Sequence, residues 1–477
     1  MTDVRARPED FDNVAFRIRR KRCVVFTVVS PFRTAYWPDV HAIASELRLP
    51  EATASALGEP AVQARFLAAL CDRGALSRSF HPARVGFKAR PGDLRRREAF
   101  RQRYRMLTFH GACSREVTLG SLEAVTAHLR MGATVDVQLK EWDVLGDWSL
   151  AKERVSDVWH YIHQTRQCRG NVTVFTQLQQ EVPSDVWEFL YDRPRVRVVW
   201  PALDLRACGD MDEFEAYREK SVPLRNLQSI SNAGLWPHVV LPVSTENVRV
   251  LCDLVAALID LTRGGSIEIV PASLMPGVSD TDPPPLGDYI EALLAIYGNP
   301  RIPLRLVAPH AWVAARVDSE TPLIGSPAAA GAELAVLANG DLYASEWAVG
   351  IERWHLGNIL QDGRAIRWER LDVLPEVFSN SLQPAQCAQC DSRYRCGGID
   401  ASVFFGGEGR RPPSVDGWSL LFELYCASRK ALFEELLWGS VEAAAQGQVK
   451  GGRERIQMQP DGITFAPAAT GDRGVRV

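Results

Sequence analysis

The stretch Cys387-Ala-Gln-Cys390-Asp-Ser-Arg-Tyr-Arg-Cys396-Gly-Gly-Ile-Asp400 is the most informative part of the chain. With Cys426, it gathers four of the ten cysteines into one region. The two-residue gap between Cys387 and Cys390 delivers two sulfurs to one point, and the glycine pair after Cys396 lets the backbone bend around a metal. We therefore predict a metal site with these four cysteines as ligands, for zinc or for an iron–sulfur cluster.

Length and charge limit the classes of protein to consider. A chain of 477 residues has room for two or three domains, each with a buried core. The formal net charge of −3 argues against a nucleic-acid partner. No stretch reaches the roughly 18 consecutive apolar residues that a membrane helix needs, and no secretory signal pattern opens the chain. We therefore expect a cytoplasmic protein without a membrane partner.

Five of the other six cysteines are scattered among apolar or helical patterns. In a cytoplasmic protein such cysteines pack as small apolar side chains, and disulfides between them are not expected. This interpretation covers Cys23, Cys71, Cys168, Cys208 and Cys252.

Strand and helix patterns alternate from residue 106 onward. This order is typical of a parallel α/β array. A basic stretch over residues 82–105 precedes the array, and we interpret it as a linker, with a groove for an acidic peptide as the alternative. The strand-like runs are Arg105–His110, Val135–Leu139, Val172–Phe175, Val196–Trp200, Val239–Val243 and Ile267–Val270.

The cysteine string resembles the SPASM domain, the C-terminal auxiliary-cluster module of many radical S-adenosylmethionine (SAM) enzymes that modify peptides. Its central triplet, Cys-x2-Cys-x5-Cys, is matched by Cys387, Cys390 and Cys396, and its final cysteine by Cys426. The segment Val336–Ser345 resembles the strand-turn-strand of the same domain, but Ser345 stands where that family has a cysteine. The resemblance implies that the inner auxiliary cluster is lost. The outer one would be retained as a single [4Fe–4S] cluster, with zinc as the alternative metal.

The resemblance also implies an architecture. The α/β array over residues 106–315 resembles the partial (β/α)6 barrel of the radical SAM fold, and residues 316–440 would form the SPASM domain. Residues 1–81, with a strand pattern and two helix patterns, resemble the winged-helix-like module that recognises leader peptides in this family. Such a module adds an extended peptide to a sheet edge; a purely structural cap is the alternative. The tail, residues 441–477, is expected to be mobile or to pair with a partner.

The residues that carry the radical chemistry are missing. The family holds its catalytic cluster with Cys-x3-Cys-x2-Cys after the first barrel strand, where this chain has only Cys113. An alternative alignment on Ser30–Trp37 places Ser, Thr and Trp at the cysteine positions. The Gly-Gly-Glu-Pro motif that binds SAM is replaced by Lys140-Glu141-Trp142. Because one cysteine cannot hold a cubane, we expect a degenerate, pseudo-radical-SAM protein that does not bind SAM and has no catalytic residues of that type.

Two functions fit these expectations. In the first, the chain is non-catalytic: it binds a ribosomally made precursor peptide, or pairs with an active maturase or a second copy of itself, and its cluster stabilises the fold. In the second, it is a redox module or an enzyme, in which the outer cluster transfers electrons or the barrel performs chemistry without SAM. A fully cysteine-ligated cluster has no open iron for substrate, so it can carry electrons but cannot act as a Lewis acid. We favour the first function.

Overall fold

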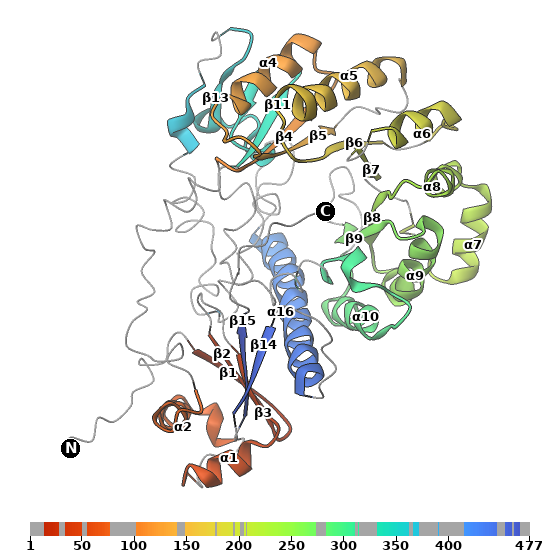
Figure 1. Ribbon diagram of the computed structural model, residues 1–477. Helices are drawn as coiled ribbons and strands as arrows, with labels where there is room; N and C mark the ends of the chain where they lie inside the picture. The colour runs from red at the N-terminus through yellow and green to blue at the C-terminus, as the bar shows by residue number, and fades with distance from the viewer. Residues whose placement is uncertain are drawn as a thin grey trace.

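Two β-sheets organise the computed structural model (Figure 1). A ten-stranded sheet carries most of the helices, and a five-stranded sheet joins the two ends of the chain. The residues described are 14–27, 34–49, 55–76, 102–140, 148–176, 179–193, 196–200, 205–206, 208–272, 283–310, 313, 332–361, 366–371, 390, 415–445, 454–459 and 462–467.

The larger sheet is mainly parallel. Its strand order is β10-β9-β8-β7-β6-β5-β4-β11-β12-β13. Strands β4 to β10 pair in parallel in chain order, β11 joins β4 in parallel, and β12 and β13 extend the sheet in the antiparallel sense. The bounds are β4 (Tyr104–His110), β5 (Thr134–Lys140), β6 (Val172–Phe175), β7 (Val196–Trp200), β8 (His238–Val243), β9 (Ser266–Pro271), β10 (Val307–Ala308), β11 (Glu333–Leu337), β12 (Asp341–Tyr343) and β13 (His355–Asn358).

Helices connect the parallel strands and lie along the outer side of this sheet (Figure 1). Several begin at side-chain caps: the Ser114 hydroxyl accepts from the Val117 amide at 3.2 Å, and a carboxylate oxygen of Asp210 accepts from the Glu213 amide at 2.8 Å. The parallel strands and the helices between them confirm the parallel α/β array predicted from the sequence. The helices are α4 (Arg115–Thr126), α5 (Trp148–His160), α6 (Ser184–Tyr191), α7 (Met211–Lys220), α8 (Val222–Asn232), α9 (Leu251–Thr262) and α10 (Leu286–Gly298).

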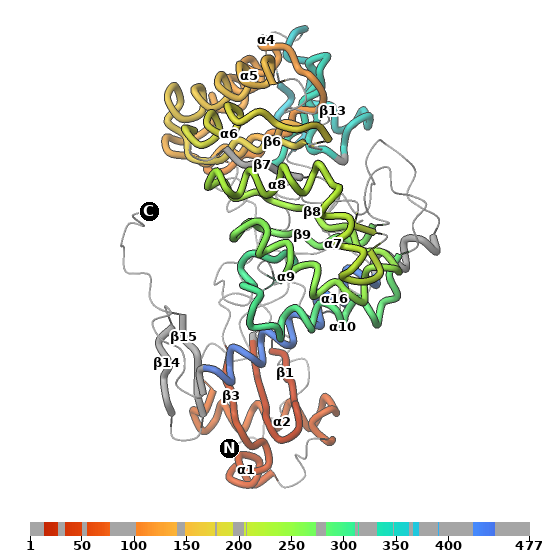
Figure 2. The backbone as a smooth tube through the Cα atoms, turned by 90° about the vertical axis from the view of Figure 1, so that its right-hand side faces the viewer, coloured from red at the N-terminus to blue at the C-terminus, as the bar shows by residue number. Residues whose placement is uncertain are grey.

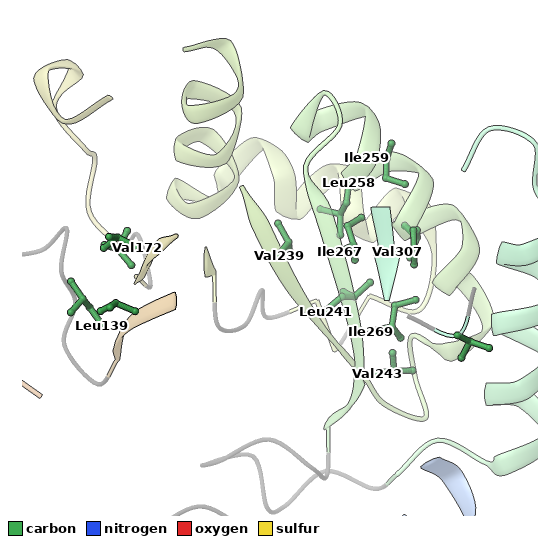
Figure 3. Close-up of a cluster of buried hydrophobic side chains, with 14 of the residues drawn as sticks. Leu139, Val172, Val239, Leu241, Val243, Leu258, Ile259, Ile267, Ile269 and Val307 are labelled. Atoms are coloured by element: carbon green, nitrogen blue, oxygen red, sulfur yellow. The ribbon is translucent and has the colours of Figure 1, made fainter. Parts of the chain in front are cut away.

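The two faces of the parallel strands differ in character. Aliphatic side chains of β8 and β9 pack against α9, which contributes Leu258 and Ile259 (Figure 3). Each fully buried side chain of this kind stabilises the fold by about 1.5–3 kcal/mol. The register places polar residues side by side on the opposite face, where Thr108 pairs with Gln138 and His110 with Lys140. We call this polar face the inner face.

The strand-turn-strand expected over Val336–Ser345 is confirmed by β11 and β12. Gly340 has φ of +89°, a backbone conformation that suits glycine, in the turn between the two strands. The Asn358 side chain secures this turn from β13: its amide nitrogen donates to the Asn339 carbonyl at 3.0 Å and to Asp341 at 2.8 Å. These contacts anchor β12 and β13 at the edge of the large sheet.

The smaller sheet begins with β1 (Val14–Arg19), β2 (Arg22–Thr27) and β3 (Thr34–Trp37). Helices α1 (Val40–Glu46) and α2 (Pro60–Asp72) follow, and their apolar residues form a separate core with one face of these strands. A carboxylate oxygen of Asp39 caps α1 by accepting from the His41 amide at 2.9 Å.

The C-terminal part of the chain completes the smaller sheet. Helix α16 (Val415–Ala445) leads to β14 (Glu454–Gln459) and β15 (Gly462–Pro467), which form a hairpin. Strand β15 pairs antiparallel with β3, so the sheet order is β1-β2-β3-β15-β14. Helix α16 includes Cys426, and β14 and β15 lie in the tail that was expected to be mobile or to pair with a partner.

Helix α16 lies between the two sheets in both views (Figures 1 and 2). One side of it packs against α10, where the Tyr297 hydroxyl donates to the Glu435 carbonyl at 3.3 Å. The other side meets the small sheet, where the rings of Phe26 and Phe433 pack edge to face, 5.8 Å apart. In the described part of the chain, no helix combines the length and apolar character of a membrane span.

Candidate functional site

The four predicted metal ligands are only partly described. Cys390 and Cys426 are half-buried, whereas Cys387 and Cys396 lie outside the described residues. Among the residues that the structure describes, no group of three or more His, Cys, Asp and Glu side chains could hold a metal ion. The four-cysteine site therefore stays a prediction.

The connection after the first parallel strand is described completely. Strand β4 ends at His110 and α4 begins at Arg115, so only residues 111–114 lie between them. This connection is shorter than a Cys-x3-Cys-x2-Cys motif. Its one cysteine, Cys113, is buried, with its sulfur 3.5 Å from the His110 carbonyl oxygen. Burial raises the pKa of the Cys113 thiol to about 11, so this sulfur is held as a protonated packing group.

The first charged group of the inner face is Lys140, at the end of β5. Its ammonium group forms a 2.7 Å ion pair with Glu346, in the short helix after β12, and lies 4.9 Å from the centroid of the Phe175 ring. Both contacts place negative potential beside the ammonium group. We had noted Lys140 only as a replacement for the SAM-binding motif; its neighbours Glu141 and Trp142 lie outside the described residues.

A second group lies where the family resemblance suggested a cysteine. The Ser345 hydroxyl donates to a carboxylate oxygen of Glu333 at 2.7 Å, and the Glu346 amide donates to the same oxygen at 3.1 Å. Ser345 and Glu333 are both buried. A buried carboxylate needs hydrogen-bond donors of this kind. Ser345 therefore stabilises the buried Glu333 carboxylate, a role that a cysteine bound to a metal would not perform.

A third group joins β8, β9 and α16. His238 bonds the Ser266 hydroxyl at 2.8 Å and donates from Nε2 to Glu268 at 3.1 Å. The hydrogen bond from His238 is the main cause that lowers the pKa of Glu268, and the charges of Lys140 and Arg429 lower it further. Glu268 is nevertheless 48% exposed, so this carboxylate faces solvent on the inner face.

Arg429 brings α16 into this group. Burial raises the pKa of Tyr289, which lies on α10. The charge of Arg429 lowers this pKa, but the effect of burial is larger. Because Cys426 and Arg429 are three residues apart, they lie on one side of α16. The predicted cluster ligand Cys426 is thus carried on the side of the helix that approaches the inner face.

The other end of α16 is attached to the small sheet by ion pairs. Arg17 contacts Glu434 at 2.6 Å and Arg19 contacts Glu435 at 2.9 Å. A third pair joins Arg22 of β2 to Glu442. One helix therefore places a charge near Glu268 on the inner face and is ion-paired with the small sheet, the module expected to bind peptide.

The sequence contained a signal for the inner face that we did not use. In β5 the residues Thr134, Asp136, Gln138 and Lys140 alternate with aliphatic residues, and β8 and β9 place His238 and Glu268 in otherwise apolar strands. A polar residue at every second position of a parallel strand indicates a second, hydrated face. The site as a whole presents charges of both signs.

Comparison with solved structures identifies the fold of this chain. No protein-family model matches the chain, and no curated protein does. Among solved structures, native anSMEcpe with bound AdoMet and Cp18Cys peptide matches with a TM-score of 0.51 at 12% identity, over 72% of this chain and 99% of that one. The fold is radical-SAM-like.

A second match is SuiB of Streptococcus suis, with a TM-score of 0.44 at 12% identity, over 84% of this chain and 98% of SuiB. SuiB bound to the precursor peptide SuiA matches with a TM-score of 0.41 at 12% identity, over 83% of this chain and 94% of that chain. The fold assignment rests on the anSMEcpe match, and at 12% identity that match establishes a shared fold and no shared activity.

Proposed function

We propose that this chain is a non-catalytic protein of radical-SAM-like fold that binds a ribosomally made precursor peptide and pairs with an active maturase during peptide modification. The observation that carries the proposal is the connection between β4 and α4. Residues 111–114 are too few for the catalytic cluster motif, and Cys113 is buried beside the His110 carbonyl.

The chemistry of Cys113 supports the absence of SAM cleavage. An iron ligand must be a thiolate at a point that the metal can reach. Burial favours the protonated form of Cys113, and its pKa of about 11 leaves almost no thiolate at neutral pH. A single sulfur in this state cannot hold the cluster that reduces SAM.

Two features support peptide binding. The inner face presents Lys140 and Glu268, and Arg429 of α16 adds a positive charge that acts on Glu268. Charges of both signs suit the backbone and polar side chains of a peptide. The small sheet, with α1 and α2 on one face, has the strand-and-helix composition of a module that adds an extended peptide at its edge. The solved neighbours have themselves been captured with peptides.

The role that we propose for Cys387, Cys390, Cys396 and Cys426 is structural. These residues would hold one [4Fe–4S] cluster, or a zinc ion, that ties the region before α16 to the helix itself. Binding of a metal or cluster to four thiolates supplies folding free energy directly.

Binding is tested with fluorescein-labelled peptides translated from the short reading frames beside the gene, titrated with the full chain and followed by fluorescence anisotropy. A scrambled peptide of equal charge is the control. We expect saturable binding of one peptide and no change in its mass after incubation with SAM and reductant. Failure of every such peptide to bind, or a mass change produced by this chain alone, would contradict the proposal.

A further inference from the structure

The N-terminal strands β1, β2 and β3 would have an edge at β3, and in this structure another strand is paired there. Strand β15 pairs with β3 through Ile463 with Tyr36, Thr464 with Ala35 and Phe465 with Thr34. On its other side β3 pairs with β2, so both edges of β3 carry strands. The occupant comes from the opposite end of the same chain.

The pairing between β15 and β3 is the shortest in this sheet. It involves three residue pairs, whereas β14 and β15 pair through six and β1 and β2 through six. The hairpin therefore holds itself together more extensively than it holds β3. Each hydrogen bond of the ladder contributes little net free energy. A competing strand can therefore replace β15 on β3.

The hairpin is also tethered close to this edge. Helix α16 ends at Ala445, and only residues 446–453 separate it from β14. The helix itself is fixed to the small sheet by the ion pairs of Arg17 and Arg19. A short tether gives the attached strand an effective concentration of about a millimolar. A free peptide must therefore compete with this tethered strand for β3.

We propose that the hairpin β14–β15, residues 454–467, is an internal occupant of the β3 edge, which an extended peptide replaces by pairing with β3 as a strand. The inference deepens the proposed function, on which its biological meaning rests, because it makes peptide binding conditional on release of the chain's own C-terminal hairpin. The competing peptide is recognised through its backbone, as strand addition requires.

The pairing itself is tested by disulfide cross-linking in the full chain. Thr34→Cys with Phe465→Cys joins two residues in register, and we expect an oxidised 34–465 link within one chain, identified by mass spectrometry. Thr34→Cys with Thr464→Cys is the matched control, one residue out of register, and should not form a link, because neighbouring strand residues face opposite sides. Equal linking of both pairs, or a link only between two chains, would overturn the proposal.

The competition is tested with Thr464→Pro. Because Thr464 lies in a strand with partners on both sides, a proline there removes a donor and disrupts the ladder. Thr470→Pro, beyond the last strand, is the control. We expect faster hydrogen exchange at residues 34–37 in Thr464→Pro, with exchange at residues 14–19 unchanged as proof that the module is folded.

The probe for the opened edge is a labelled synthetic peptide of residues 454–467, added in trans. Thr464→Pro should bind it about tenfold or more tightly than the wild-type chain or Thr470→Pro, since the tethered competitor is gone. A second variant, ending after Ala445, should bind equally tightly if Thr464→Pro is unstable. Equal binding by wild type and both variants would overturn the proposal. This probe needs no natural peptide, so its result is independent of whether the proposed function holds.

Discussion

The Ser345 hydroxyl donates a 2.7 Å hydrogen bond to the Glu333 carboxylate, and both residues are buried at the junction of β11 and β12. Where the family resemblance suggested a cysteine ligand, the chain has a hydrogen bond that stabilises a buried acid. This position therefore holds a hydrogen-bond donor with a structural role.

Removal of that donor should destabilise the fold. Ser345→Ala leaves Glu333 buried with one donor fewer, which costs about 1–3 kcal/mol of unfolding free energy. The measurement is urea unfolding followed by circular dichroism. Ser229→Ala is the control, because its hydroxyl is exposed and donates only to the Arg225 carbonyl of its own helix. Equal effects of the two substitutions would contradict the assigned role.

The ion pair between Arg17 and Glu434 should stabilise the docking of the small sheet on α16. Both side chains are about 30% exposed, so a double-mutant cycle with Arg17→Ala and Glu434→Ala should give a coupling of about 1 kcal/mol that weakens at high salt. The pair Arg301–Asp260, with exposures of 72% and 67%, is the control and should show less coupling. If the coupling between Arg17 and Glu434 is no larger than that between Arg301 and Asp260, the Arg17–Glu434 ion pair does not stabilise the docking of the small sheet on α16.

Burial of His310 should make stability depend on pH. Its Nε2 donates to the Leu293 carbonyl at 2.7 Å, and burial lowers its pKa to about 4. The folded state keeps this histidine neutral while the unfolded state binds a proton below about pH 6.5, so stability should fall as pH drops from about 6.5 to 4, by on the order of 3 kcal/mol.

His310→Gln should flatten that dependence, since a neutral amide can replace the donor. His160→Gln, at an exposed position of α5, should keep the wild-type slope. The measurement is unfolding free energy at several pH values between 4 and 7. A steep dependence that survives in His310→Gln would assign the titration to another group.

Substitution of the predicted cluster ligands should remove the metal. Cys390→Ala with Cys396→Ala should lose all bound iron and sulfide, or all bound zinc, because two thiolates cannot hold the site. Cys252→Ala is the control, as Cys252 packs on α9 beside Asn299 and should leave the metal content unchanged. Iron retained in the double variant would refute the ligand assignment.

The sequence predicted the parallel array because its signals are local. Aliphatic runs such as Val239–Val243 depend on neighbouring residues, and the structure has β8 where this strand was expected, with helix α9 between it and the next strand. The helix end at Gly74, with φ of +71°, could likewise be predicted from one residue type.

The features that escaped prediction depend on contacts between distant segments. Nothing in the pattern around Ile463 identifies β3 as its partner, because the two strands lie at opposite ends of the chain. Lys140 and Glu346 meet only when β5 and the segment after β12 are placed on the same sheet. Charged residues on the inner face therefore look like ordinary surface residues until the fold is known.

The most direct measurement is the release of 5′-deoxyadenosine from SAM by protein purified without oxygen, loaded with iron and sulfide and reduced with dithionite. We expect no more product than in a no-protein control, because residues 111–114 offer a single, buried cysteine. Product above that control, abolished by Cys113→Ala, would show that this chain cleaves SAM and would contradict the non-catalytic function.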